Sequence, residues 1–148
     1  MSKGIGRLLC GLLLVWAGSV GAADHSFIKG PINSGPEATK ACLECHKDSA
    51  MDIMKTSHWT WDAQQKINGK TVKRGKINAV NNFCVSVRSN EPRCTSCHIG
   101  YGWKNAEFDF TDVSKVDCLV CHDTTGTYKK VPTGAGMPDE SIDLTYIS

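Results

Sequence analysis

The sequence lacks an excess of charge of either sign. Its 148 residues include 17 lysines and arginines against 15 aspartates and glutamates. Two of the basic residues, Lys3 and Arg7, lie in an N-terminal segment that we expect to be removed, which leaves 15 of each kind. A near-neutral polypeptide has little electrostatic attraction for a phosphate backbone. We therefore expect no nucleic-acid partner.

Long apolar runs are also missing. The apolar run of residues 8–20 is too short to span a bilayer, and it lies between basic residues and a segment of small residues. This order predicts a cleaved signal peptide over residues 1–23. The alternative, a lipid anchor on Cys10, is disfavoured because the apolar run mostly follows that cysteine. Residues 24–148 are therefore expected in the periplasm, without a stable membrane anchor.

The chain that remains after cleavage also lacks an even number of cysteines. The whole sequence has eight cysteines, and loss of Cys10 leaves seven. A framework of disulfides in an exported protein needs cysteines in pairs. Disulfides are therefore not the main use of cysteine in this protein.

Six of the seven cysteines fall into three copies of the pattern CxxCH. The copies are motif 1 (Cys42-Leu-Glu-Cys45-His46), motif 2 (Cys94-Thr-Ser-Cys97-His98) and motif 3 (Cys118-Leu-Val-Cys121-His122). This pattern is the signature of haem c attachment, because two thiols add to the vinyl groups of one porphyrin and the histidine binds its iron. We therefore predict three covalently bound haem c groups, with the six cysteines as attachment points and the three histidines as iron ligands.

A zinc ribbon is the competing interpretation of motifs 2 and 3. Their CxxC pairs are separated by 20 residues, which suits a four-cysteine zinc site. However, the chain has only five histidines, and one of them follows each CxxC pair. Zinc does not require that histidine, whereas haem c does. Export to the periplasm, where haem c belongs, also favours haem.

The predicted haems also determine the expected fold class. Three porphyrins are large apolar groups that can supply much of the core, so we predict a multihaem cytochrome c fold, mainly α with extensive irregular structure. Asn68-Gly69 predicts a short β-hairpin within residues 64–73. Helices are expected over residues 36–47 and 48–61, with further helix starts near residues 90–92, 117 and 138. Four aromatic residues are expected to pack against haems: Trp59, Trp61, Tyr101 and Trp103.

Two histidines remain as candidate second ligands for three irons. We predict that His25 and His58 bind iron; the alternatives are a surface histidine and a core histidine, respectively. At least one iron then has no second histidine from this chain. That position is filled by a methionine, by a lysine or by a missing segment, or it stays empty. An iron with two firm axial ligands only passes electrons, whereas an open iron can bind substrate. This difference separates an electron carrier from an enzyme.

Three segments resemble the N-terminal part of the octahaem tetrathionate reductase family of periplasmic multihaem cytochromes c. They are CLECHKDSAMDIMKTSHWTW, NNFCVSVRSNEPRCTSCHIGYGW and VDCLVCHD. The resemblance runs from about Thr39 to the end of the chain. It implies that motif 2 carries the catalytic haem, with Asn81 and Cys84 beside it, and that the family's distal lysine and nearby aspartate lie beyond Ser148. It also implies reduction of a small sulfur or nitrogen oxyanion, with electrons from redox proteins or quinol-linked cytochromes.

The resemblance leads to two expectations about the whole protein. We expect residues 24–148 to be the trihaem N-terminal part of a longer reductase; the alternative is a self-contained trihaem electron carrier. Because the downstream lysine and aspartate are not in the sequence, turnover by this chain alone is not predicted. After cleavage, Cys84 is the one cysteine outside the motifs. The alternatives for it are a buried thiol and a partner in an intermolecular disulfide. The resemblance instead implies that it lines the distal side of the second haem.

Overall fold

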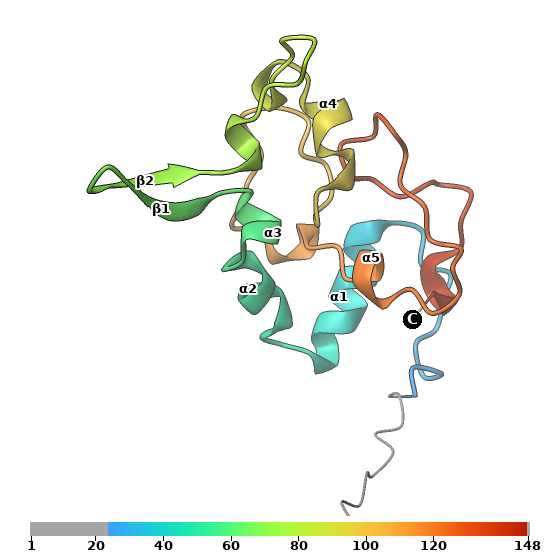
Figure 1. Cartoon of the computed structure of the whole chain (residues 1–148). Helices are drawn as coiled ribbons and strands as arrows, with labels where there is room; N and C mark the ends of the chain where they lie inside the picture. Colours follow the sequence, from blue (N-terminus) through green and yellow to red (C-terminus); the bar gives the residue numbers. More distant parts are fainter. Residues whose placement is uncertain (1–23, 148) are drawn as a thin grey trace, which may run out of the picture.

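Short helices and long connecting segments make up most of the chain in this computed structural model, which describes residues 24–147 (Figure 1). The predicted signal peptide, residues 1–23, lies outside the described part. The described α-helices and strands are α1 (Gly35–Cys45), α2 (Ser49–Met54), α3 (Ser57–Thr60), β1 (Ala63–Ile67), β2 (Lys70–Arg74), α4 (Glu91–Cys94) and α5 (Leu119–His122). Single 3₁₀ turns lie at Lys76–Asn78, Val87–Ser89, Thr95–Cys97, Val113–Lys115 and Leu144–Tyr146. The fold is mainly α with extensive irregular structure, as predicted.

Helix α1 begins with a capped first turn and ends within motif 1. The Ser34 hydroxyl accepts a hydrogen bond from the backbone N–H of Glu37 (3.4 Å), and proline occupies the first turn. The Ser cap provides an acceptor for one N–H group that a helix start leaves without a partner, and the proline has no N–H that needs one. The predicted helix over residues 36–47 is thus confirmed with slightly earlier bounds.

The helix predicted over residues 48–61 is wrong in one respect, because the structure divides it into α2 and α3. Thr56 between them has an extended backbone, and its hydroxyl donates to the carbonyl of Ile53 (2.7 Å). A threonine side chain that hydrogen-bonds nearby backbone competes with helix continuation. The break turns Trp59 inward, at 1% exposure, and leaves Met51 at 50%. Met51 and His58 recur at helical spacing in the sequence, but because of the break they do not share the face of one helix.

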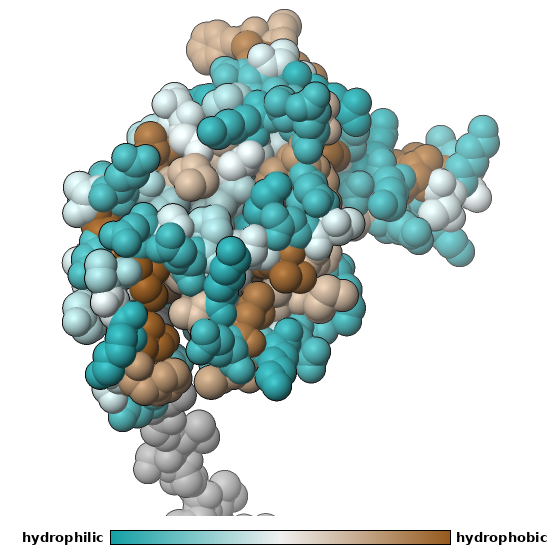
Figure 2. All heavy atoms as spheres, turned by 180° about the vertical axis from the view of Figure 1, so that it is seen from behind, coloured by the Kyte–Doolittle hydropathy of each residue, from teal (hydrophilic) through white to brown (hydrophobic). Residues whose placement is uncertain are grey.

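The β-hairpin is confirmed by β1 and β2, which pair antiparallel with Ile67 opposite Lys70. Asn68 and Gly69 between them have φ values of 49° and 76°, the left-handed conformation that a tight hairpin turn requires. The hairpin projects from the body as an arm (Figure 1), and its surface is mainly hydrophilic (Figure 2).

The buried residues form two clusters. One consists of Ala50, Trp59, Trp61, Val87, Trp103, Phe108 and Val116. The other consists of Ile32, Ala38, Leu119, Leu144 and Ile147 and joins α1 and α5 to the C-terminal segment. Tyr101 is also buried, at 1% exposure. All four aromatic residues expected to pack against haems are buried, and their contact with haems stays a prediction.

The segment after Pro138 forms turns and one 3₁₀ turn, so the helix expected to start there is absent from the described residues. The carboxylate of Asp139 accepts from Ser141 N–H (2.9 Å), and that of Asp143 accepts from Thr145 N–H (2.9 Å). Such local aspartate hydrogen bonds stabilise turns in place of a continuous helix. Among residues 24–147, no helix combines the length and apolar character that crossing a bilayer requires.

Candidate haem-binding sites

Motifs 1 and 3 lie side by side, because α1 packs against α5 and the segment before it (Figure 1). The Thr39 hydroxyl donates to the carbonyl of Val116 (2.5 Å). The thiols of Cys42 and Cys118 interact, which lowers the pKa of Cys42 to about 7 and raises the pKa of Cys118. The first attachment cysteines of two motifs far apart in the sequence are therefore neighbours.

His25, a predicted second ligand, lies next to His46 of motif 1. Their ring centroids are 6.3 Å apart, and His46 is exposed. Two imidazoles on opposite sides of one iron have ring centres ~6 Å apart, since each metal–nitrogen bond is ~2 Å and the nitrogen is ~1 Å from its ring centre. The separation of the two rings and the exposure of His46 fit a haem between them.

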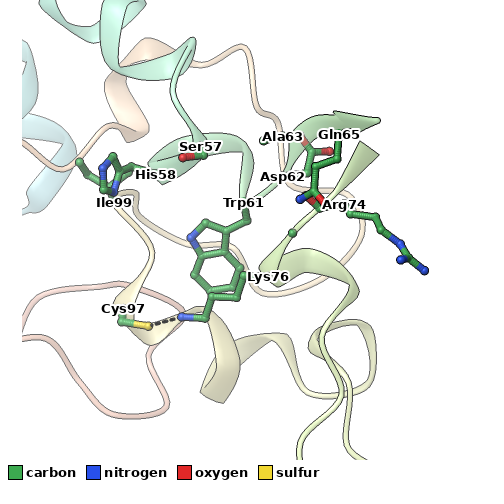
Figure 3. A pocket seen from close by; sticks show the side chains of 11 residues that line it. Ser57, His58, Trp61, Asp62, Ala63, Gln65, Arg74, Lys76, Cys97 and Ile99 are labelled. Carbon is green, nitrogen blue, oxygen red and sulfur yellow. Dashed lines mark hydrogen bonds between the residues drawn. The ribbon is translucent and has the colours of Figure 1, made fainter. Parts of the chain in front are cut away.

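Motif 2 borders a cavity of about 490 Å³, a volume in the range of small-molecule and cofactor sites. Cys97 and His58 both line it, together with Trp61, Lys76 and Ile99 (Figure 3). The structure thus brings the second predicted distal ligand, His58, to the cavity that holds an attachment cysteine of motif 2.

Lys76 is a residue of this cavity that the sequence did not single out as part of the site. Its Nζ is 2.9 Å from Cys97 Sγ and 4.2 Å from the centroid of the Trp61 ring. The contact of Lys76 with Cys97 could not be predicted from the sequence, because it depends on how the turn after the hairpin packs.

His98 of motif 2 is fully buried among aromatic rings. The centroids of Trp103, Trp59 and Trp61 lie 4.9, 5.1 and 5.4 Å from its own. Burial lowers its pKa to about 4, so the ring is neutral at neutral pH, which is the state that binds metal. Nε2 is 2.7 Å from the Trp59 carbonyl, whereas Nδ1 is the one buried side-chain polar atom among residues 24–147 without a hydrogen-bond partner.

These features fit an iron ligand in part. A neutral imidazole with an unpartnered nitrogen, directly after two cysteines, has the donor set of haem c. However, the ring faces the aromatic cluster and one nitrogen is engaged by a carbonyl. Binding iron through Nε2 requires that His98 release the Trp59 carbonyl. Motif 3 is simpler, since both Cys121 and His122 are exposed on α5.

Asn81 and Cys84 lie together in a loop beside motif 2. The Asn81 carboxamide oxygen accepts hydrogen bonds from the backbone N–H groups of Phe83 (2.9 Å) and Val85 (3.0 Å). Cys84 is exposed, and its φ of 59° lies in the left-handed region that non-glycine residues seldom adopt. Neither residue lines the cavity at Cys97.

Ser86, at the end of this loop, lies next to motif 2. The carbonyl of Ser86 is 4.0 Å from Cys94 Sγ. The tip carries exposed apolar side chains, with Phe83 at 78% and Val80 at 59% exposure, and the surface there is hydrophobic (Figure 2). The loop therefore adjoins motif 2 at Cys94, while the side chain of Asn81 is occupied by hydrogen bonds to its own backbone.

Comparisons with known proteins match this chain to one family and to two proteins. The family described as cytochrome c554 and c-prime matches residues 41–123. The crystal structure of an octaheme cytochrome c from Shewanella oneidensis has a TM-score of 0.78 and 60% sequence identity, covering 83% of this chain. An uncharacterized protein from Archaeoglobus fulgidus is 27% identical over 95 residues, or 58% of this chain. The chain spans only 28% and 31% of those two proteins, respectively. The structural likeness confirms the predicted multihaem cytochrome fold.

Proposed function

This chain belongs to the cytochrome c554 and c-prime family, and we propose that it is the N-terminal, trihaem part of an octahaem reductase. It is a multihaem c-type cytochrome that transfers electrons through covalent haem c. The observation that carries the proposal is the 60% identity, over 83% of this chain, to an octaheme cytochrome c of which the chain spans 28%. The proposed reaction is the reduction of tetrathionate or another small sulfur or nitrogen oxyanion, as the resemblance of its motifs implies.

The proposed roles of the chain's residues follow from the three motifs. When bound, each haem c supplies an iron that accepts and releases single electrons. Two cysteines of each motif hold the porphyrin, and the histidine that follows them binds the iron. Cys94, Cys97 and His98 would hold the haem at which substrate reacts. Asn81 and Cys84 are proposed to act beside that haem, which is supported by the contact between their loop and Cys94.

The second axial ligands are proposed from proximity. His25 is assigned to the iron of motif 1 because its ring lies 6.3 Å from that of His46. His58 lines the cavity at Cys97 and is not assigned to one iron, because a firm ligand there would close the haem at which substrate is proposed to react. We place the protein in the periplasm, with residues 1–23 as a signal peptide and residues 24–148 as the trihaem region. Its partners would be electron-donor redox proteins or quinol-linked cytochromes.

A self-contained trihaem electron carrier is the second candidate function. The pairing of His25 with His46 favours it, because an iron with two histidines has no position for substrate. The two candidates differ in whether any iron of the reduced holoprotein takes up an added ligand. Binding of carbon monoxide or nitrite supports the reductase, and failure to bind either supports the carrier.

The haem count is the direct test of the trihaem proposal. We expect the mass of the exported holoprotein to exceed that of its polypeptide by three haems, all retained after denaturation because thioether bonds hold them. Peptide mapping should find one haem on each CxxCH motif. A protein that carries zinc, or that shows no haem mass increment, would contradict the proposal.

Replacing His25 by alanine tests the proposed second ligand of motif 1. We expect one of the three irons to change from six-coordinate low-spin to five-coordinate high-spin, because only one haem loses its second axial ligand. Electron paramagnetic resonance of the oxidised holoprotein measures this change. Lys29→Ala, in the same exposed segment, is the control and should leave all signals in place. An unchanged spectrum in the His25 variant would make His25 a surface histidine.

A further inference from the structure

Asp117 and Lys130 form a buried ion pair that the haem chemistry described above does not use. Lys130 Nζ is 2.7 Å from Asp117 Oδ2, and the two side chains are 10% and 0% exposed. Taking two charges out of water costs several kcal/mol per ion in typical cases, so a buried pair by itself is weak evidence for stability. The position of each charge indicates a different role.

The negative end of the pair lies at the start of motif 3. Asp117 directly precedes Cys118, and its Oδ1 accepts a hydrogen bond from the backbone N–H of Val120 in the first turn of α5 (3.0 Å). The hydroxyls of Tyr101 and Tyr128 donate to its two oxygens at 2.9 and 2.8 Å. Burial raises the pKa of both tyrosines, so both remain donors. The carboxylate is therefore held in one place.

The positive end of the pair lies at motif 2. Lys130 Nζ donates a hydrogen bond to the backbone carbonyl of His98, at 2.5 Å. The two motifs are joined nearby by backbone hydrogen bonds from Asp117 N–H to Ile99 O (3.2 Å) and from Tyr101 N–H to Lys115 O (2.8 Å). The ion pair thus spans the junction between the two motifs, with its cation on motif 2 and its anion on motif 3.

The placement of the cation at motif 2 and the anion at motif 3 affects the reduction potential of any redox group at these motifs. A nearby cation favours the reduced state of an iron, which carries one positive charge less, and a nearby anion favours the oxidised state. These effects are larger in a buried site than in water, because the effective dielectric constant is lower. A pair oriented in this way would raise the reduction potential of a redox group at motif 2 relative to that of one at motif 3.

We propose that the charges of Asp117 and Lys130 set the order of the reduction potentials of the haems of motifs 2 and 3. The haem of motif 2 then has the higher potential and is the preferred electron acceptor. The proposal rests on the proposed function, which places a haem c at each motif. A haem held by Cys118, Cys121 and His122 would supply the electron, and a haem held by Cys94, Cys97 and His98 would accept it. One electron moves, and no other reactant takes part.

The test compares haem-specific potentials of the holoprotein with those of the double variant Asp117→Asn/Lys130→Met, which removes both charges at similar side-chain size. A redox titration followed by the NMR signals of the haem methyl groups, assigned to each motif, gives the separate potentials. We expect the separation between motifs 2 and 3 to narrow and the potential at motif 1 to change least. The control is Asp112→Asn/Lys115→Met, a half-exposed pair 3.8 Å apart, which should leave the separation unchanged.

Two milder variants keep the proposal testable if the double variant does not fold. Lys130→Arg keeps the cation and should retain the wild-type order of potentials. Tyr128→Phe removes one donor from the carboxylate, which leaves its charge less compensated, and should widen the separation. An unchanged separation in both the double variant and Tyr128→Phe, even with lower stability, would overturn the proposal. A wild-type protein without haem on motifs 2 and 3 would instead overturn the proposed function, and its mass would show this directly.

Discussion

Replacing Trp59 by alanine is expected to lower the free energy of unfolding of the holoprotein by about 3–5 kcal/mol, the usual cost of truncating a large buried aromatic side chain. The Trp59 ring is 1% exposed, and its centroid lies 5.1 Å from that of His98 and 5.7 Å from that of Phe108. Its indole N–H also donates to the carbonyl of Phe110 (3.0 Å), which would lose this partner. Chemical denaturation followed by near-ultraviolet circular dichroism measures the change.

The matched control for this substitution is Phe83→Ala. Phe83 is an aromatic residue at 78% exposure, and exposed substitutions usually change stability by no more than about 0.5 kcal/mol. We also expect the Trp59 variant, unlike the control, to change the absorption of the haem of motif 2, because His98 would lose the ring packed against it. Equal stabilities of the two variants would show that the aromatic cluster around His98 does not form.

The parts of the fold that the sequence predicted are those that depend on residues close together in the chain. The turn at Asn68-Gly69 is determined by two residues that tolerate positive φ, and the start of α1 by Ser34 and the proline that follows it two residues later. Each CxxCH motif is likewise a local pattern with a local chemical reason. These features need no knowledge of the rest of the molecule.

The division of the helix after residue 48 could not be predicted in this way. The periodicity of Met51, Met54, His58 and Trp61 is that of one helical face, and Thr56 alone is only a weak local reason to break it. The structure breaks the helix because Trp59 and Trp61 are drawn into a cluster with Trp103 and Phe108, from segments more than forty residues later in the sequence. Tertiary packing has here overridden a local pattern.

The least predictable parts of the site are contacts between distant segments. The approach of Cys42 to Cys118, of Lys76 to Cys97 and of Lys130 to His98 depends on how the connecting segments fold back. A single sequence contains no spacing rule for such contacts. The sequence marked residue 117 only as an expected helix start, and the partners of Asp117 could not be named from it.

Removing the haem of motif 2, by the double variant Cys94→Ala/Cys97→Ala, is expected to abolish binding of carbon monoxide to the reduced holoprotein. The structural reason is a difference between the motifs. His46 of motif 1 has a second histidine ring at 6.3 Å, which fits an iron closed on both sides. Motif 2 adjoins a cavity of about 490 Å³ that leaves room for a small ligand. Visible spectra of the reduced protein with and without carbon monoxide measure binding.

The control is Cys42→Ala/Cys45→Ala, which removes the haem of motif 1 and should leave carbon monoxide binding in place. Mass spectrometry must show the loss of one haem in each variant, so that the two proteins differ only in which haem is missing. Wild-type protein that binds the ligand, with binding lost in the motif 2 variant alone, would place the reactive iron at motif 2, as a reductase requires. Carbon monoxide binding that survives in the motif 2 variant would show that the open iron belongs to motif 1 or motif 3. Because Cys42 and Cys118 are in contact, a loss caused by disturbing motif 3 would appear in the control and not in the motif 2 variant.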